Sequence, residues 1–177
     1  MLDIPFEIAE TREVEERYPD GMPKEEVPEY LSRLKAEAYR DFLKEGDILI
    51  TADTVVLLEG EIIGKPRSPE DAKTMLSKLS GKVHRVITGV SLTSQNKSES
   101  FSVKTDVKFA PLTSEEINYY VNKYRPLDKA GAYGIQEWIG LVGIEKIEGD
   151  FYNVMGLPVH RLIEKLTEIP EERFQKL

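Results

Sequence analysis

Two β-prone apolar runs enclose a carboxylate in the stretch from residue 47 to 66, DILITADTVVLLEGEIIGKP. The first run is Ile48–Ile50, the second is Val55–Leu58, and Asp53 lies between them. Moving even a neutral polar group out of water without a partner costs roughly 2–7 kcal/mol, so a buried carboxylate needs a partner, a metal or a chemical role. Gly64-Lys65-Pro66 follows within about ten residues and brings a cation close to Asp53. The pattern predicts a phosphate-and-metal site, and the alternative is an Asp that caps a turn beside a solvent-exposed Lys.

The composition narrows the function classes. The 177 residues fit one domain, spanning 1–177, and the net charge of −8 argues against a broad nucleic-acid surface, which would be basic. The absence of cysteine excludes disulfides, thiolate nucleophiles and Cys-bound zinc, and the two histidines lie far apart in the sequence. A bound metal would therefore take oxygen ligands, which favours Mg²⁺ or Mn²⁺. No apolar run approaches the length of a membrane span and no signal peptide opens the chain, so we expect a cytoplasmic protein without a membrane partner.

Strand and helix patterns alternate along the chain, and the sequence therefore predicts an α/β fold with a mixed β-sheet flanked by helices. One helix is expected to begin at Val27, with an apolar face that reaches Phe42, and another over Pro158–Leu166. The capping pattern at Ser68 and the capping box at Thr113 each predict the start of a further helix. Glu59-Gly60 predicts a hairpin turn. Further strands are expected at Val83–Thr93, Phe101–Phe109 and Ile139–Ile147, and residues 168–177 as a polar tail.

Several short motifs follow one another along this chain: Thr51–Val56, Gly64–Pro66, Leu79–Gly81 with His84 and Thr88–Val90, Asp128–Gln136, Glu148–Asp150, Asn153-Val154 and Gly156–Pro158. In this order they closely resemble the motifs of the Maf proteins. The resemblance implies an elongated α/β fold shared with the inosine-triphosphate pyrophosphatases. It also implies a nucleoside triphosphate pyrophosphatase that uses a divalent metal to release a nucleoside monophosphate and pyrophosphate, in proteins that are often homodimers and are linked to septum formation.

The resemblance also implies roles for individual residues. Asp53 would be the proton acceptor that activates water, and Glu16 would bind the metal together with Asp53, with Glu15 in the preceding acidic position. Lys35 and Lys65 would contact phosphate oxygens. Thr54 and Gln136 fall where the subgroup acting on dTTP and UTP carries Thr and Gln, and the Gln136 amide can both donate to and accept from a pyrimidine edge.

One departure from the family pattern bears on activity. Maf proteins begin with a strand and a Ser-x-Ser-Pro-Arg-Arg segment, and this sequence starts just past that segment. We therefore expect an unoccupied sheet position and an impaired phosphate site. The leading hypothesis is a dTTP/UTP pyrophosphatase. The alternatives are a nucleotide-binding or septum-formation regulator with little catalysis, and a house-cleaning pyrophosphatase for modified pyrimidine nucleotides.

Overall fold

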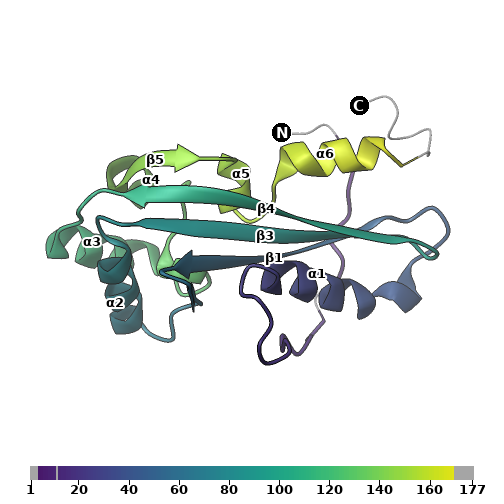
Figure 1. Ribbon diagram of the computed structural model, residues 1–177, viewed down its shortest axis with the longest axis horizontal. Coiled ribbons are helices and arrows are strands. Elements are labelled where there is room, and N and C mark those ends of the chain that lie inside the picture. Colours follow the sequence, from purple (N-terminus) through teal and green to yellow (C-terminus); the bar gives the residue numbers. More distant parts are fainter. Residues whose placement is uncertain (1–3, 11, 170–177) are drawn as a thin grey trace.

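A five-stranded sheet in the order β2-β1-β3-β4-β5 forms the centre of the structure, a computed structural model that describes residues 4–10 and 12–169. The strands are β1 (Leu49–Leu58), β2 (Glu61–Ile63), β3 (Val83–Thr93), β4 (Ser98–Phe109) and β5 (Ile144–Glu148). β1, β3 and β4 are long and run along the longest dimension of the molecule, which gives the elongated shape in Figure 1. The predicted α/β class is confirmed.

All four strand pairings are antiparallel, so the expectation of a mixed sheet is wrong for the described residues. Short turns join β1 to β2 and β3 to β4, and these two pairs are antiparallel because parallel neighbours would need longer crossovers. Longer segments join β1 to β3 and β4 to β5, and the fold of these segments sets the direction of the two pairs. The β1–β2 turn is the predicted Glu59-Gly60 hairpin, with both residues at positive φ.

The outer edge of β1 is only partly paired. β2 covers β1 at Val56–Leu58, whereas β3 pairs with β1 from Leu49 to Leu57. Within the part of the chain that the structure describes, the edge from Leu49 to Val55 therefore has no strand partner. Asp53 lies on this open edge, opposite Gly89 of β3.

Helices cover both faces of the sheet. They are α1 (Val27–Glu37), α2 (Pro69–Leu79), α3 (Ser114–Tyr124), α4 (Trp138–Gly143), α5 (Phe151–Val154) and α6 (Val159–Thr167), with the 3₁₀ turns η1 (Arg40–Phe42) and η2 (Ala130–Ala132). The predicted caps are confirmed: Ser68 accepts from the Asp71 N–H, and Thr113 forms a capping box with Glu116.

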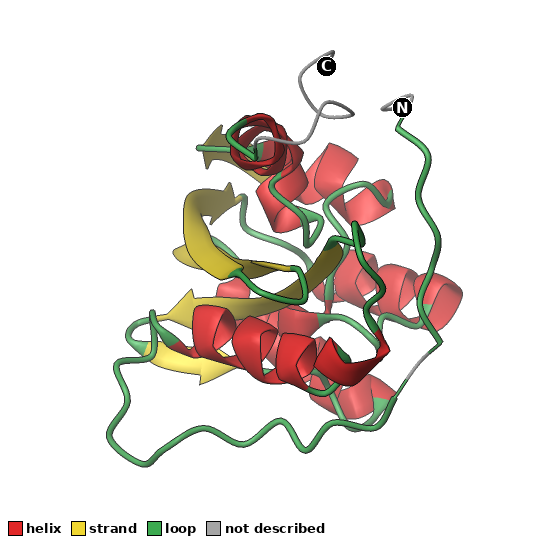
Figure 2. Ribbon diagram, turned by 90° about the vertical axis from the view of Figure 1, so that its right-hand side faces the viewer, coloured by secondary structure: helices red, strands yellow, loops and turns green. Residues whose placement is uncertain are grey.

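The two faces carry different apolar clusters. Helix α1 packs on one face, where Val27 and Leu31 meet Val55, Leu57 and Ile87. On the opposite face α6 packs against one end of the long strands, and α2, α3 and η2 pack against the other end. Figure 1 shows these helices at the two ends, and Figure 2, turned by 90°, shows the twisted sheet with helices beside it.

Two predicted elements are wrong. The segment expected as a strand over Ile139–Ile147 begins as helix α4 and becomes β5 only at Ile144. Ile139 is buried while Leu141 is 84% exposed, which suits one face of a helix, and short apolar runs do not distinguish the two structures by period alone. Helix α1 ends at Glu37, so Phe42 does not continue its apolar face; its ring is exposed and lies 3.5 Å from the Arg12 guanidinium.

No helix within residues 4–10 and 12–169 combines the length and apolar character needed to cross a membrane. The predicted tail over 168–177 lies outside the described residues, apart from its first two.

Candidate active site

Asp53 lies in the middle of β1, which continues without a break from Leu49 to Leu58. Its side chain is 11% exposed and faces α1, on the same side of the strand as Val55. Lys35 of α1 donates to Asp53 Oδ1 over 2.6 Å. The carboxylate therefore has the partner that its position between two apolar runs required.

Close packing of α1 on the sheet positions Lys35. A Cβ on Gly89 would lie 2.2 Å from the Glu29 backbone nitrogen, so only glycine permits the helix to approach β3 beside Asp53. Farther along the helix, Ser32 Oγ shares a hydrogen bond of 2.8 Å with Ser91 Oγ, and Thr51 Oγ1 donates to the Ser32 carbonyl over 2.7 Å. These contacts fix the helix so that Lys35, one turn later, reaches the open edge of β1.

A second carboxylate shares the same lysine. Glu16, from the acidic loop before α1, places Oε1 3.0 Å from Lys35 Nζ. Glu15 instead pairs with Arg17 at 2.7 Å. The structure thus brings Asp53, Lys35 and Glu16 together from three separate segments.

Burial and charge act in opposite directions on the two central groups. Burial, the largest effect, raises the pKa of Asp53, and the Glu16 charge raises it further. The Lys35 ammonium, and more weakly Lys65, lower this pKa, but the net change is upward. For Lys35, burial lowers the pKa, but Asp53 and Glu16 outweigh it and the net direction is again upward. Lys35 therefore remains a cation, while Asp53 is a stronger base than an exposed aspartate.

Thr54 lies on the opposite face of β1 from Asp53, because successive side chains of a strand alternate. Its hydroxyl is 2.9 Å from Thr88 Oγ1 on β3. A ligand that contacts both Asp53 and Thr54 must therefore reach both faces of the strand.

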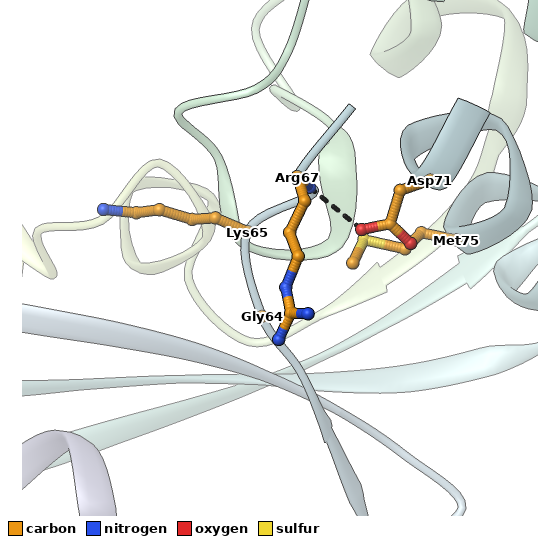
Figure 3. A pocket seen from close by; sticks show the side chains of 5 residues that line it. All are labelled: Gly64, Lys65, Arg67, Asp71 and Met75. Atoms are coloured by element: carbon orange, nitrogen blue, oxygen red, sulfur yellow. Dashed lines mark hydrogen bonds between the residues drawn. The ribbon is translucent and has the colours of Figure 1, made fainter. Parts of the chain in front are cut away.

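Lys65 lies two residues after the end of β2 and is exposed. It lines a cavity of about 510 Å³ together with Gly64, Arg67, Asp71 and Met75. Figure 3 shows its side chain directed away from Arg67 and Asp71. Asp53 does not line this cavity, but the charge of Lys65 acts on Asp53 and weakly opposes the rise in its pKa.

The loop that carries Gln136 is held against the sheet. Gly131, at φ +71°, donates to the Gly64 carbonyl over 3.0 Å and packs on Val56. Tyr133 is bonded to the buried His84 through its hydroxyl, with 2.7 Å to Nε2. Gln136 itself is exposed in a turn, on a loop that packs on the same face of β1 as Thr54.

The family model described as Maf-like protein matches residues 1–169 of this chain. The chain belongs to the Maf family. Three of its relatives bear the name dTTP/UTP pyrophosphatase. One from Porphyromonas gingivalis is 51% identical over 172 residues, covering 96% of this chain and 86% of the relative. One from Bacteroides thetaiotaomicron is 49% identical and one from Phocaeicola vulgatus 51% identical, each over 168 residues, with 95% of this chain and 87% of the relative covered.

The carboxylate oxygens of this Maf protein suit a metal ion that also binds the phosphates of a substrate. Among the described residues no group of three or more His, Asp or Glu side chains is arranged to hold a metal ion. Glu16 and Asp53 nevertheless each place a carboxylate oxygen within 3.0 Å of Lys35 Nζ, so two carboxylates lie close together. Mg²⁺ is commonly bound by one or two carboxylates together with substrate phosphates, so the pair fits such an ion.

Sequence reasoning missed two features of the Maf site. Arg67 lines the same cavity as Lys65, and its place two residues after Lys65 was the available signal. Asn153 and Thr88 form a fully buried polar chain that ends at Thr54. Both residues lie in the family motifs, but their contact across 65 positions is visible only in the fold.

Proposed function

We propose that this Maf protein is a nucleoside triphosphate pyrophosphatase that hydrolyses dTTP and UTP to the monophosphate and pyrophosphate. The observation that carries the proposal is the desolvated Asp53, which shares one lysine with Glu16 at the open edge of β1. The names of relatives that are about half identical over nearly the whole chain support it.

Asp53 is assigned as the general base. Water attacks the α-phosphorus, a new P–O bond forms, and the bond to the oxygen bridging the α- and β-phosphorus breaks to release pyrophosphate. The proton of the attacking water passes to Asp53. Lys35 donates to Oδ1, and we assign the proton to Oδ2. A raised pKa favours this role because base strength increases with it.

The cations are assigned to the phosphates. Lys35 is held at the base, and Lys65 is exposed nearby and directed away from Arg67, so the two can contact different oxygens of a triphosphate. Glu16 and Asp53 would hold a divalent cation, Mg²⁺ or Mn²⁺, which when bound would neutralise charge that develops on the phosphates.

Base selection is assigned to Thr54 and Gln136. A uracil or thymine edge presents an N–H between two carbonyls, which an amide that both donates and accepts can pair. Cytosine presents an acceptor ring nitrogen and an exocyclic donor, so part of this pairing fails. An unpaired buried polar group costs roughly 1–3 kcal/mol, or about ten- to a hundredfold in selectivity.

The test is chromatographic detection of dTMP and pyrophosphate from dTTP with added Mg²⁺. Product formation supports the enzyme, whereas nucleotide binding without turnover favours the regulator with little catalysis. Faster turnover of a methylated UTP or of pseudo-UTP than of UTP favours the house-cleaning alternative.

The role of Gln136 is tested by comparing kcat/KM for dTTP and CTP in the parent and in Gln136→Ala. We expect the dTTP preference to narrow in the variant. If both rates fall together and their ratio stays the same, Gln136 positions its loop and does not read the base.

Assembly and location belong to the same proposal. We propose a cytoplasmic homodimer that binds a small nucleotide and has no nucleic-acid partner, consistent with the net charge of −8. Light scattering coupled to size exclusion measures the oligomeric state, and a monomer at micromolar concentration contradicts the dimer.

A further inference from the structure

A buried chain of hydrogen bonds leads from the backbone of α5 to the Thr54 hydroxyl. Thr88 Oγ1 donates to the Asn153 carbonyl over 2.9 Å, and Thr54 Oγ1 lies 2.9 Å from Thr88 Oγ1. Thr88 and Asn153 are both fully buried, whereas Thr54 is half-buried. The chain therefore runs from the interior to a side chain that is partly exposed.

The inner end of this chain is held rigidly. Asn153 Nδ2 donates to the Val86 carbonyl over 3.1 Å and to Thr105 Oγ1 over 2.9 Å. Thr105 Oγ1 in turn donates to the Asp150 carbonyl over 3.1 Å. These bonds tie the segment around α5 to β3 and β4, so the Asn153 carbonyl is fixed beneath Thr88.

The direction of the protons follows from this arrangement. A hydroxyl carries one proton, and a carbonyl oxygen only accepts. Because the Thr88 proton is used on the Asn153 carbonyl, Thr88 must accept in its bond with Thr54. The single Thr54 proton then points into the protein, and only its lone pairs remain for a ligand.

We propose that Asn153 and Thr88 fix the Thr54 hydroxyl as a hydrogen-bond acceptor, and that this polarity selects uracil and thymine over cytosine. The inference rests on the proposed function and adds Thr88 as a positioning residue for base selection. Uracil and thymine carry a proton on N3, which an acceptor binds, whereas N3 of cytosine is itself an acceptor and repels it.

The space beside Thr54 is consistent with an approaching base. Gly156, at φ +108°, lies next to the hydroxyl, and a Cβ there would come within 3.6 Å of Thr54 Oγ1. Glycine therefore keeps a side chain away from the oxygen.

The experiment compares Thr88→Val with Thr88→Ser. Valine keeps the shape but removes the hydroxyl, so the Thr54 proton is free to turn towards the ligand. Serine retains the hydroxyl and serves as the matched control. Calorimetry with the α,β-methylene analogues of dTTP and CTP measures base preference without hydrolysis.

In the parent we expect the dTTP analogue to bind more tightly. In Thr88→Val the preference should fall about tenfold or more, with affinity for the CTP analogue unchanged or increased, and in Thr88→Ser it should persist. Thr88 acts through the Thr54 hydroxyl, so the double variant Thr54→Val with Thr88→Val should show the same preference between the two analogues as Thr54→Val alone. Equal loss of both affinities in Thr88→Val shows a merely structural role and overturns the inference, as does a parent without preference.

A measurement on the unmodified protein covers the case in which Thr88→Val does not fold. The Thr54 hydroxyl proton should be protected from exchange in proton NMR, because it is donated inward, and rapid exchange with water overturns the inference. Hydrolysis of dTTP is assayed separately. If the protein prefers the dTTP analogue in binding but does not hydrolyse dTTP, the proposed enzyme is wrong and the inference about Thr54 stands. If it hydrolyses dTTP but shows no base preference, the proposed enzyme stands and the inference about Thr54 is wrong.

Discussion

Replacing Asp53 by asparagine separates the chemistry of the site from its stability. We expect Asp53→Asn to lower kcat for dTTP by about 10²–10⁴, the usual contribution of a general base. We also expect the folded protein to lose little or no stability. The two expectations rest on different features of the same carboxylate.

The small effect on stability follows from burial. Burial raises the pKa of Asp53 above its ordinary value despite the neighbouring lysine, so the fold disfavours the ionised form, and that cost is present at pH values above the folded pKa. Asparagine removes the cost. Lys35 keeps Glu16 at 3.0 Å and can still donate to the asparagine oxygen. Breaking a buried ion pair typically costs about 3–5 kcal/mol; because no charge is left unpaired, we expect a change of about 1 kcal/mol or less, or roughly 2–4 °C in Tm.

Asp106→Asn is the matched control. Asp106 also lies in a strand and pairs with a cation, Arg85, at 2.7 Å, but that bond lowers its pKa. Its ionised form stabilises the fold above the unfolded pKa, so the control should retain turnover and lose stability. Pyrophosphate release and thermal unfolding are measured on all three proteins. Turnover of Asp53→Asn within a few-fold of the parent, or a loss of folded protein large enough to explain the rate, refutes the reasoning.

Three further outcomes follow from the structure. Burial lowers the pKa of His84 to about 4, so between pH 6.5 and 4 the unfolded chain binds a proton at this residue that the folded protein does not. His84 should therefore lower the free energy of unfolding by about 3 kcal/mol over this range. Denaturant unfolding across this range should show that the free energy of unfolding depends less steeply on pH in His84→Gln than in the parent, and equal slopes in the two proteins contradict the assignment. Gly89→Ala places a Cβ against the Glu29 backbone, so it should destabilise the protein by about 1–3 kcal/mol or more and reduce turnover because α1 shifts. An unfolding curve identical to that of the parent would count against this packing. Turnover should require Mg²⁺ or Mn²⁺ and stop in excess EDTA, and full activity with the chelator contradicts an oxygen-ligated metal.

The local sequence determined the elements whose signals lie within a few residues. Ser68 and Thr113 cap their helices through neighbours three positions away, and Gly60 readily takes the positive φ that its hairpin turn requires. The apolar runs around Asp53 likewise indicated a buried carboxylate with a partner, because the cost of burying a charge is a property of the group itself.

Local sequence failed where the neighbours came from elsewhere in the chain. The apolar run from Ile139 suits a helix or a strand equally, and packing decided that it begins as α4. The direction of the β1–β3 and β4–β5 pairs depends on how the longer segments between these strands fold back, which no signal within a few residues specifies.

The site shows the same division. The resemblance to the Maf family named Asp53, Lys35 and Glu16, but only the fold showed that one ammonium joins both carboxylates. Thr88 and Asn153 lie 65 positions apart, and the proton direction that they impose on Thr54 arises from a carbonyl held beneath a strand. Residue types determined which chemistry was possible, and tertiary contacts decided where each proton and charge lies, because hydrogen bonds act only between groups that the fold has brought within about 3 Å.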